Sequence, residues 1–333
     1  MTTNSGTAWV RVVIVNYNGG KLLQSCIDAL ATQSMTDFEA VIVDNASTAP
    51  PVTDLHLPDA RFRIHHAGEN IGFAAGCNLG AHGATARWIA TLNPDAMPRP
   101  DWLAQLRGAT KRYPQVRMFG STQMDANDPS ISDGFGDLLT AFGTAWRSGG
   151  GLPVSALPAS DRAPFSACAA AALYARSSFE AASGFDERFF CYLEDVDLGF
   201  RLRLRGETCV QVRRAEVLHV GSALTGRLSD FSIFHSYRNR IWLFVKCVPL
   251  PLVPLLSLLQ AAATMVAVAR PKARPYRAAA LKGIWAGLKG LPQAIADRRR
   301  VQRERTVSTY DVARMMIWTP LHRQPRMPPP ITR

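Results

Sequence analysis

Hydrophobic runs and amphipathic stretches alternate along the first 120 residues of the chain. Short apolar runs rich in β-branched residues predict strands at 9–16, 39–45, 61–66 and 87–93. Helical spacing of apolar residues predicts helices at 21–32 and around 74–84. Strands that alternate with helices are typical of a parallel sheet with helices on both faces. The pattern therefore predicts an α/β fold built on a Rossmann-like sheet.

Polar side chains follow three of these predicted strands at the points where the strands end. They are Asn16 and Asn18, Asp44 and Asn45, and Asn93 and Asp95. Ligands of such sheets bind beyond the carboxyl ends of the strands. Each group also has a local explanation, because Asn18-Gly19-Gly20 and Asn93-Pro94-Asp95 can be turns and Asp44 or Ser47 can cap a helix. Since three strand ends agree, we expect a ligand site at this edge.

Several classes of protein are disfavoured by what the sequence lacks. No G-x-G-x-x-G follows the first strand and no G-x-x-x-x-G-K-[ST] occurs, so a dinucleotide oxidoreductase or a P-loop phosphotransferase is poorly supported. The six cysteines form no C-x-x-C pair, which argues against a zinc cluster or a disulfide framework and favours reduced thiols in the cytosol. The polar first eight residues leave no room for a cleaved signal peptide.

The positive charge of the chain lies at its C-terminal end. The formal net charge is +12, and residues 270–333 hold 15 of the 38 Lys and Arg residues but only 3 of the 26 Asp and Glu residues. Just before this tail, residues 247–269 carry no charge, which raises a transmembrane hypothesis. The prolines at 249, 251 and 254 predict instead a helix that starts near Pro254. Such a helix of about 16 residues measures roughly 24 Å, less than a bilayer core of about 30 Å.

The next segment has the pattern of a helix that lies in a membrane interface. A helical apolar stripe is formed by Leu281, Ile284, Trp285, Leu288 and Leu291, with Lys282 and Lys289 beside it. A basic surface of this kind attracts anionic lipids. The alternative is a core-packing helix with a solvated basic face. We expect a catalytic domain at 1–245 and an apolar and basic membrane-associating region at 246–333, with no nucleic-acid partner.

Acidic residues gather in "FFCYLEDVDLGFRLRLRG", residues 189–206. Glu194, Asp195 and Asp197 can serve the first turn of a helix, where carboxylates accept hydrogen bonds from free backbone N–H groups. Asp197 can also pair with Arg201 one turn later. This local explanation competes with a catalytic one.

Six motifs occur in the order found in family 2 glycosyltransferases of the GT-A fold, and the chain resembles that family over about residues 9–245. The motifs are "VVIVNYNGG", "VIVDNAST", "ENIGFAAGCNLG", "TLNPDA", "GFDERFFCYLEDVDLGFRLRLRG" and "EVLHVGS". The resemblance is closest to a bacterial branch that contains rhamnosyltransferases of lipid-linked or cell-wall glycans. It implies an inverting enzyme that uses a nucleoside-diphosphate sugar and Mg²⁺ or Mn²⁺ and adds one sugar to a hydroxyl.

The resemblance also implies roles for particular residues. It assigns the donor nucleotide to the loop from Val15 to Asn18 and to Asp44, with the neighbouring strand-end residues, and it lines the donor site with Asn70, Gly72, Phe73 and Asn78. The complete set expected at the donor is Val15, Asn16, Tyr17, Asn18, Asp44, Asn45, Asn70, Gly72, Phe73, Asn78, Asn93 and Arg238. Arg238 and Arg240 would bind the diphosphate or a lipid pyrophosphate, although a solvated or interface-lining role is open for both.

For the chemical step the resemblance singles out four residues. Asp95 matches the metal-binding carboxylate, with Asn93 as a neutral substitute for its usual partner, and His219 approaches the metal or the diphosphate. Asp195 matches the catalytic base, and Glu194 is its neighbour. A divalent ion would stabilise the leaving diphosphate, while the base takes the proton of the acceptor hydroxyl. His219 could instead be a satisfied buried histidine.

Two regions depart from the family pattern or fall outside it. "SACAAAALYAR" lacks a glycine that many relatives have, which leaves sugar recognition near residues 168–172 unassigned. Residues 121–164 are rich in Gly, Ser, Pro and Asp and predict a long, partly mobile segment with acceptor contacts.

The sequence thus favours an inverting, metal-dependent glycosyltransferase at the cytoplasmic face of the membrane. Its favoured donor is dTDP-rhamnose, and its acceptor is a lipid-linked or growing polysaccharide. A sugar-nucleotide pyrophosphorylase should carry a glycine-rich basic loop after the first strand, and "NYNGGK" supplies too little. A non-catalytic membrane or nucleic-acid adaptor would leave the six motifs unexplained.

Overall fold

The structure, a computed structural model, describes residues 7–48, 52–221, 228–319 and 327–331. Ser222, which closes the sixth motif, and the polar residues 1–6 lie outside them. The elements are, in chain order, β1 (Val10–Asn16), α1 (Gly20–Ala31), β2 (Phe38–Asp44), η1 (Val52–Asp54), β3 (Phe62–His66), α2 (Gly72–Ala81), β4 (Trp88–Leu92), β5 (Ala96–Pro98), α3 (Trp102–Arg112), β6 (Met118–Asp125), β7 (Ser132–Gly134), β8 (Asp137–Leu139), β9 (Ala145–Arg147), η2 (Val154–Ala156), β10 (Ala171–Ala175), α4 (Arg176–Ala181), η3 (Glu187–Phe189), α5 (Glu194–Leu204), β11 (Cys209–His219), α6 (Asp230–Cys247), η4 (Leu250–Leu252), α7 (Val253–Ala269), η5 (Pro271–Tyr276), α8 (Arg277–Lys289), α9 (Leu291–Arg303) and α10 (Thr309–Met315).

One mixed sheet forms the centre of the fold, in the strand order β3-β2-β1-β4-β10-β6-β11-β5, with β7 paired to β6. The strands predicted from the sequence, β1 to β4, are parallel, as expected. β10 runs antiparallel to both β4 and β6, and β11 is again parallel to β6. The carboxyl ends of β1, β2, β4, β6 and β11 therefore lie at one edge of the sheet, where β10 begins.

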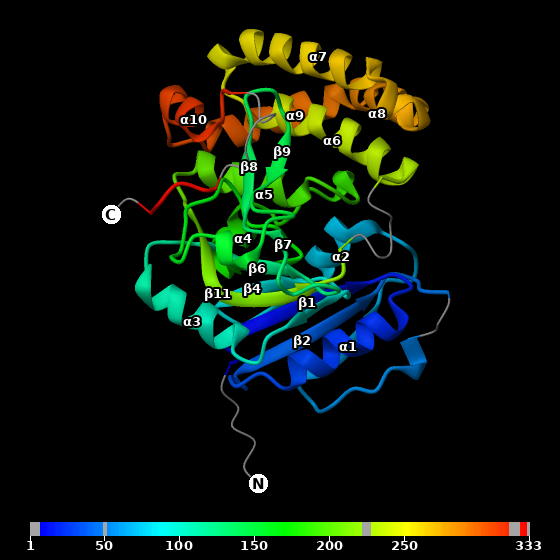
Figure 1. Cartoon of the computed structure of the whole chain (residues 1–333), viewed down its shortest axis with the longest axis vertical. Helices are drawn as coiled ribbons and strands as arrows, with labels where there is room; N and C mark the ends of the chain where they lie inside the picture. The colour runs from blue at the N-terminus through cyan, green and yellow to red at the C-terminus, as the bar shows by residue number, and fades with distance from the viewer. Residues whose placement is uncertain (1–6, 49–51, 222–227, 320–326, 332–333) are drawn as a thin grey trace.

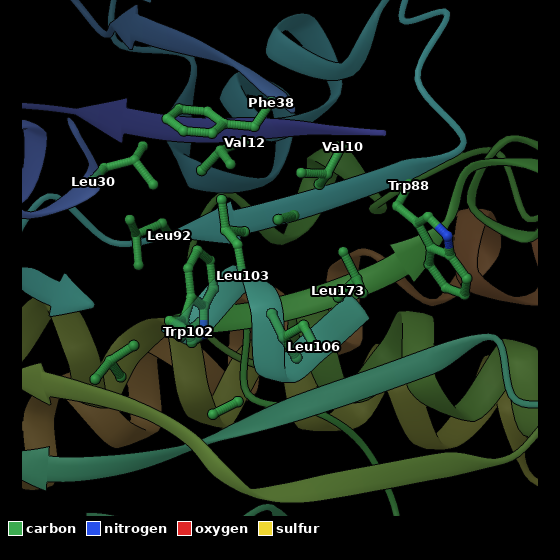
Figure 2. Packing of buried hydrophobic residues seen from close by; sticks show 14 of the residues in the cluster. Val10, Val12, Leu30, Phe38, Trp88, Leu92, Trp102, Leu103, Leu106 and Leu173 are labelled. Atoms are coloured by element: carbon green, nitrogen blue, oxygen red, sulfur yellow. The ribbon is translucent and has the colours of Figure 1, made fainter. Parts of the chain in front are cut away.

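Both faces of the sheet are covered by helices, which explains why β1 is buried along its whole length. Alternate residues of a strand point to opposite faces. Val12 and Ile14 belong to the core that also holds Leu30 of α1 and Trp102 of α3 (Figure 2). Val13 and Val15 face a second core, which they share with α2, α4 and α5.

Residues 121–164, predicted to form a long, partly mobile segment, contain several short strands. β6 occupies the start of this segment, β7 pairs with it, and β8 and β9 form a hairpin. The backbone of Asp137 in β8 pairs with Ser166, next to β10. On its other side the hairpin bonds to the C-terminal part of the chain, because Ile317 exchanges backbone hydrogen bonds with Leu139 and Ala141. The sequence did not indicate these strands because their partners are distant along the chain.

The C-terminal helices α6 to α10 gather at the end of the molecule opposite α1 and β2 (Figure 1). All of them except α8 share a third core with α5, in which Phe200 lies with Leu243, Val301 and Val312. α6 itself runs through residue 245 to Cys247. The C-terminal region is therefore packed directly against the helix that carries the proposed catalytic acids.

The apolar segment forms a helix close to the predicted start, since α7 begins at Val253. Together with the preceding turn η4, Leu250–Ala269 makes a helix of 20 residues with a mean hydropathy of 2.0, of which 11% is buried. Within the described residues it alone is long and apolar enough to cross a membrane, judged by length and composition. Pro251 and Pro254 lie in first turns, where their missing N–H groups break no hydrogen bond. The α-helix itself has 17 residues, which confirms the predicted length of about 16, and the 20 residues include the three of η4.

Candidate active site

The carboxyl ends of β1 and β2 are joined by a network of side-chain hydrogen bonds. The buried Asn16 donates through Nδ2 to Ser47 Oγ (2.9 Å) and accepts at Oδ1 from Gly19 N (3.0 Å). Asn18 N donates to the same Ser47 hydroxyl (2.9 Å). Asp44 Oδ1 accepts from Ser47 N (3.2 Å). These bonds bear out the turn explanation locally and hold the strand ends in a fixed shape, whereas α1 begins after Gly19 with no side-chain cap.

Two side chains expected at this end of the donor site differ in exposure. Val15 is buried at the end of β1, whereas 43% of Tyr17 is exposed. An exposed aromatic ring beside the strand ends offers a flat surface on which a nucleotide base can stack.

The "NIGF" segment is fixed to the end of β2 by two asparagines. Asn45 Nδ2 donates to Asn70 Oδ1 (2.9 Å), and Asn45 Oδ1 accepts from Ile71 N (2.9 Å). Gly72 opens α2 with φ +83°, and a Cβ there would lie 2.6 Å from the Phe190 ring. Only glycine fits this position without strain. Phe73 follows and lines the cleft described below.

Asn78 has a different setting from the other members of this motif. Its Nδ2 donates to Phe185 O (2.9 Å) and its Oδ1 accepts from Phe185 N (2.9 Å). Nδ2 also contacts Glu187 Oε1 (3.0 Å). Both ends of the amide are thus engaged in joining α2 to the turn before α5, and Asn78 is not among the residues that line the cleft with Asp195.

The residues predicted to bind metal come together from β4, β5 and β11. β5 pairs antiparallel with β11 so that Ala96 faces His219, which brings Asp95 beside the imidazole. His219 Nε2 lies 3.4 Å from Asp95 Oδ1 and 3.4 Å from Asn93 Nδ2. On the other side of the ring, Nδ1 lies 2.8 Å from Asp133 Oδ2. His219 and Asp95 are both almost fully buried.

This donor set suits a divalent cation such as Mn²⁺. Carboxylate oxygens bind Mg²⁺ and Mn²⁺, and Mn²⁺ also accepts imidazole nitrogen. Two ligand atoms about 2.1 Å from one ion stand roughly 3 Å apart when adjacent, close to the 3.4 Å between Asp95 Oδ1 and His219 Nε2. The pair is therefore spaced like two ligands of one ion. A diphosphate and water would have to complete the coordination.

Asp195 and Glu194 lie on the wall of a cleft of about 280 Å³ at the same edge of the sheet. The cleft is lined by Phe73, Asn93, Asp137, Ala145, Arg147, Cys168, Ala169, Ala170, Cys191, Tyr192, Leu193, Glu194, Asp195, Val196 and Ser236. Asp195 is partly exposed and accepts hydrogen bonds from Ala169 N (3.0 Å) and Val196 N (2.8 Å). Asn93, next to the proposed metal ligands, and Asp195 thus share one cleft.

The acids at the start of α5 divide into two roles. The N-cap residue is Leu193, in a left-handed conformation, and no side chain caps the helix. Asp197 is fully buried and pairs with Arg201 Nε (2.8 Å), as predicted, and with Lys246 Nζ (2.7 Å). Asp197 is therefore part of the packing between α5 and α6, whereas Asp195 faces the cleft.

Arg147 and Asp137 enter the cleft from the β8–β9 hairpin. Arg147 Nη1 lies 2.9 Å from Asp133 Oδ2, and its Nη2 lies 3.0 Å from Cys168 Sγ. Ligand atoms of Asp137, Cys168 and Asp195 all lie within 4.8 Å of one another, a spacing that could hold a metal. Because the Arg147 guanidinium already places a cation against this group, the pair of Asp95 and His219 is the better metal site.

Burial of these acids favours their neutral forms. Burial raises the pKa of Asp195, although hydrogen bonds from Ala169 and Val196 oppose the shift. Burial, together with the charge of Asp195, raises the pKa of Asp137 to about 8. The pKa of Glu194 is also raised by burial, and its Oε2 has no hydrogen-bond partner. For His219, burial lowers the pKa, but Asp133 and Asp95 outweigh it and the pKa is raised.

Arg238 and Arg240 are engaged within the protein. Arg238 Nη2 donates to the carbonyl oxygens of Arg188 (3.0 Å) and Phe189 (2.8 Å), and burial lowers its pKa to about 10. Arg240 Nη2 donates to Thr264 Oγ1 of α7 (2.5 Å). Neither residue lines the cleft. Their positions match the interface-lining alternative.

Between these arginines, Asn239 supports the segment that precedes Glu194 and Asp195. It is fully buried, and its Nδ2 donates to the carbonyl oxygens of Phe189 (2.9 Å), Cys191 (3.0 Å) and Tyr192 (2.7 Å). Phe190, Tyr192 and Leu193 all have positive φ, a conformation that costs free energy in residues other than glycine. Asn239 compensates for part of that cost.

Sequence reasoning missed Asp133, Asp137, Arg147 and Asn239. The first two flank the turn in "SDGFGD", where Asp-Gly pairs usually indicate only a loop. Their functional position depends on the pairing of β7 with β6 and of the hairpin with Ser166, contacts that have no local pattern. Asn239 lies in "YRNRI", where the neighbouring arginines were the more obvious candidates.

A mixed sheet that is covered by helices on both faces and has polar residues at its carboxyl edge has the arrangement of the GT-A fold. Solved structures agree on the fold. A mannosyltransferase from Pyrobaculum calidifontis in complex with GDP-Man and Mn²⁺ is 18% identical, with a TM-score of 0.52 over 90% of this chain and 86% of that chain. GalNAc-T7 with UDP, GalNAc and Mn²⁺ is 12% identical, with a TM-score of 0.62 over 88% of this chain and 57% of that chain.

The sequence defines the family. The profile described as glycosyl transferase family 2 matches residues 11–124. An N-acetylglucosaminyl-diphospho-decaprenol L-rhamnosyltransferase of Mycobacterium tuberculosis is 30% identical over 245 residues, which cover 65% of this chain and 77% of that protein. The O-antigen biosynthesis protein RfbC of Myxococcus xanthus is 28% identical over 234 residues, covering 66% of this chain and 18% of that protein. The chain belongs to glycosyl transferase family 2.

Proposed function

We propose that the protein is an inverting, metal-dependent glycosyltransferase of cell-envelope glycan synthesis. Its donor is a nucleoside-diphosphate sugar, with dTDP-rhamnose favoured, and its acceptor is a hydroxyl of a lipid-linked or polysaccharide glycan. The observation that carries the proposal is the arrangement of one cleft. Asp195 lines it on the α5 side, and Asn93, in contact with the pair of Asp95 and His219, lines it on the sheet side.

The proposed step is a single displacement at the anomeric carbon. Asp195 accepts the proton of the acceptor hydroxyl as its oxygen forms the new glycosidic bond, and the bond from the anomeric carbon to the diphosphate breaks. The hydrogen bonds from Ala169 N and Val196 N hold the carboxylate of Asp195 in place for this role. A positioned base of this kind contributes about 10²–10⁴-fold to the rate.

Asp95 and His219 would hold a divalent cation, whose chemistry when bound is to neutralise the negative charge that develops on the leaving diphosphate. Asn16, Asn18, Asp44 and Asn45 would shape the end of the site that binds the nucleoside. Their side chains are ordered by hydrogen bonds with the backbone and with the neighbouring side chains of Ser47 and Asn70. The site would therefore change little when the donor binds.

The choice of rhamnose and of a lipid-linked acceptor rests on the relative from M. tuberculosis, whose name contains both a rhamnosyl transfer and a decaprenol diphosphate. To test it, purified protein is incubated with UDP-, dTDP- and GDP-sugars and either Mg²⁺ or Mn²⁺, with a polyprenyl-diphosphate-linked N-acetylglucosamine as acceptor. Release of nucleoside diphosphate is measured. We expect dTDP-rhamnose to be consumed only when metal and acceptor are both present. Turnover of another sugar nucleotide would contradict dTDP-rhamnose as the donor. Turnover in the presence of EDTA would contradict the proposed metal dependence.

We further propose that residues from about 247 to 300 dock the enzyme on the cytoplasmic face of the membrane. α8 packs on the rest of the protein through small residues, with Gly283 and Gly287 buried. Three residues of the predicted stripe point outward, since 53% of Leu281, 60% of Trp285 and 46% of Leu288 are exposed, whereas Ile284 and Leu291 are half-buried. Burial in a lipid interface would remove this apolar surface from water.

α7 presents a similar surface beside α8. Leu258 and Met265 on its outer side are each more than 60% exposed, whereas Leu256 and Gln260 are buried. Gln260 packs against Gly143 at the tip of the β8–β9 hairpin. Spanning the membrane would remove Gln260 from this contact, so α7 is proposed to lie along the surface. Lys282 and Lys289 would meet anionic headgroups.

Flotation with vesicles of phosphatidylglycerol and of phosphatidylcholine tests this docking. We expect preferential binding to the anionic vesicles, release by high salt or alkaline carbonate, and reduced binding of Trp285→Ser. Ala104→Ser, at an exposed position of α3, is the control. Recovery solely with detergent would show that α7 spans the bilayer and would overturn the surface orientation.

A further inference from the structure

Asp133 has no role in the reaction proposed above, although it contacts one of the proposed metal ligands. It lies in β7 and is 9% exposed, and its Oδ2 contacts two donors at once. His219 Nδ1 is 2.8 Å away, and Arg147 Nη1 is 2.9 Å away. No metal contact is needed to explain either interaction.

The contact with Asp133 determines which nitrogen of His219 faces the proposed metal. An ionised carboxylate only accepts hydrogen bonds, so the imidazole must donate through its Nδ1–H. In the neutral ring Nε2 then carries the lone pair, and Nε2 is the atom 3.4 Å from Asp95 Oδ1. Metal-binding histidines are commonly oriented in this way by a carboxylate on their second nitrogen.

We propose that Asp133 is the positioning residue of the metal site, which holds His219 in the Nδ1–H tautomer with Nε2 directed toward Asp95. The inference rests on the metal assignment made under the proposed function. It adds a residue from the segment 121–164 to a site whose other members follow β4 and end β11.

The fold keeps Asp133 in place from two directions. β7 pairs with β6, and β6 pairs with β11 so that Asp125 faces His219. From the opposite side, Arg147 reaches Asp133 from the β8–β9 hairpin. Gly134, the next residue in β7, makes room for it, because a Cβ at Gly134 would lie 2.4 Å from Arg147 Cδ.

Arg147 also keeps Asp133 suited to this role. Arg147 Nη1 and His219 Nδ1 both contact Asp133 Oδ2, so the guanidinium fixes the orientation of the carboxylate toward the imidazole. Arg147 thereby links the metal side of the cleft to the base side, where its Nη2 contacts Cys168.

The first test measures Mn²⁺ affinity rather than turnover. Mn²⁺ is titrated into the protein in the presence of dTDP and, separately, of UDP, and free Mn²⁺ is followed by electron paramagnetic resonance. We expect Asp133→Asn to weaken Mn²⁺ binding about 10–100-fold. The matched control is Asp128→Asn, an exposed acid of the neighbouring turn, which should leave the affinity unchanged.

A double-variant cycle shows whether Asp133 acts through His219. If it does, Asp133→Asn should have no further effect once His219→Ala is present. An additive loss would make Asp133 a ligand in its own right and would overturn the positioning role. So would unchanged Mn²⁺ affinity in Asp133→Asn while Asp95→Ala and His219→Ala both lose binding. If none of these variants affects Mn²⁺, the metal assignment and the inference fail together.

The second test needs no metal. Two-bond ¹H–¹⁵N correlation spectra distinguish the two tautomers of a neutral imidazole, and they are recorded at a pH where His219 is neutral. We expect the Nδ1–H tautomer in the wild-type protein and in Asp128→Asn, and a shift toward Nε2–H in Asp133→Ala. Finding Nε2–H in the wild-type protein would overturn the proposal even if Asp133→Asn weakens metal binding.

Discussion

The two sides of the cleft use polar residues in opposite ways. On the donor side, at the ends of β1 and β2, the amides of Asn16, Asn18 and Asn45 are hydrogen-bonded to the backbone and to neighbouring side chains. On the α5 side, Asp137 and Glu194 are buried near Asp195, and burial raises the pKa of all three. Buried polar groups are usually hydrogen-bonded. The donor side follows this rule, whereas on the α5 side Glu194 Oε2 is buried without a hydrogen-bond partner.

This difference separates residues that give shape from residues that perform chemistry. Amide side chains that are hydrogen-bonded within the protein can be buried at little cost in free energy. They need no ligand to complete their hydrogen bonds. Burying a carboxylate destabilises the fold, so such residues usually persist where function requires them. Strongly shifted pKa values therefore tend to mark active sites. Changes on the α5 side should alter rate or pH dependence, and changes on the metal side should alter donor binding.

The largest effect is expected for Asp195→Asn. A neutral amide cannot accept the proton of the acceptor hydroxyl, so turnover should fall about 100-fold or more. Asn retains a side-chain oxygen, so the free energy of unfolding should change by less than about 1–2 kcal/mol. Steady-state turnover, donor affinity and thermal unfolding are measured on one preparation.

Asp197→Asn, on the same turn of α5, is the matched variant for this experiment. It leaves Lys246 and Arg201 without a full counter-charge in a buried site, so it should cost about 3–5 kcal/mol of stability. We expect Asp195→Asn to lose rate and Asp197→Asn to lose stability. Near wild-type turnover of Asp195→Asn would assign the base elsewhere, with Glu194 the next candidate.

The next largest effect separates the metal side from the nucleoside end of the donor site. Asp95→Ala removes a carboxylate from the proposed metal site, so calorimetry with Mn²⁺ should show donor affinity lowered at least about tenfold. Asp44→Ala should lower nucleotide affinity while the requirement for Mn²⁺ persists. Equal donor affinity in wild type and Asp95→Ala, each with Mn²⁺ present, would contradict the ligand assignment.

A smaller effect, on stability, is expected where α6 supports the segment before α5. Asn239→Ala leaves the carbonyl oxygens of Phe189, Cys191 and Tyr192 without their donor, at a cost of about 1–3 kcal/mol. Because this segment positions Asp195, turnover should fall more than donor affinity does. Denaturant unfolding is compared with Asn127→Ala, an exposed asparagine. If the two variants were equally stable, Asn239 would not support this segment.

Regions whose contacts are local in sequence could be predicted, and regions whose contacts join distant segments could not. β1 to β4 have local hydrophobic periodicity, and the polar residues Asn16, Asp44 and Asn93 lie at one edge of the sheet, as predicted. Asp197 and Arg201 are one helical turn apart, so their ion pair was also predictable. Asp133 and Arg147 were not, because β7 and the hairpin obtain their positions from β6, Ser166 and Ile317, distant segments that leave no periodic signal.

The smallest effect concerns Asp137 and tests whether the α5 side is destabilising in itself. Its folded pKa of about 8 lies above the ordinary value of 3.8, so the folded state binds a proton that the unfolded state has already released at neutral pH. Stability from this group is complete below about pH 4 and is lost as pH rises toward and through 8. Asp137→Asn keeps the neutral form at every pH, so at pH 9 it should be more stable than wild type by at least about 1 kcal/mol. At pH 4 the two proteins should unfold alike, and the comparison is made by urea denaturation at both pH values. A variant that is less stable than wild type at pH 9 would show that the Asp137 carboxylate is stabilised by its surroundings, Arg147 among them, and that the contrast between the two sides of the cleft does not extend to this residue.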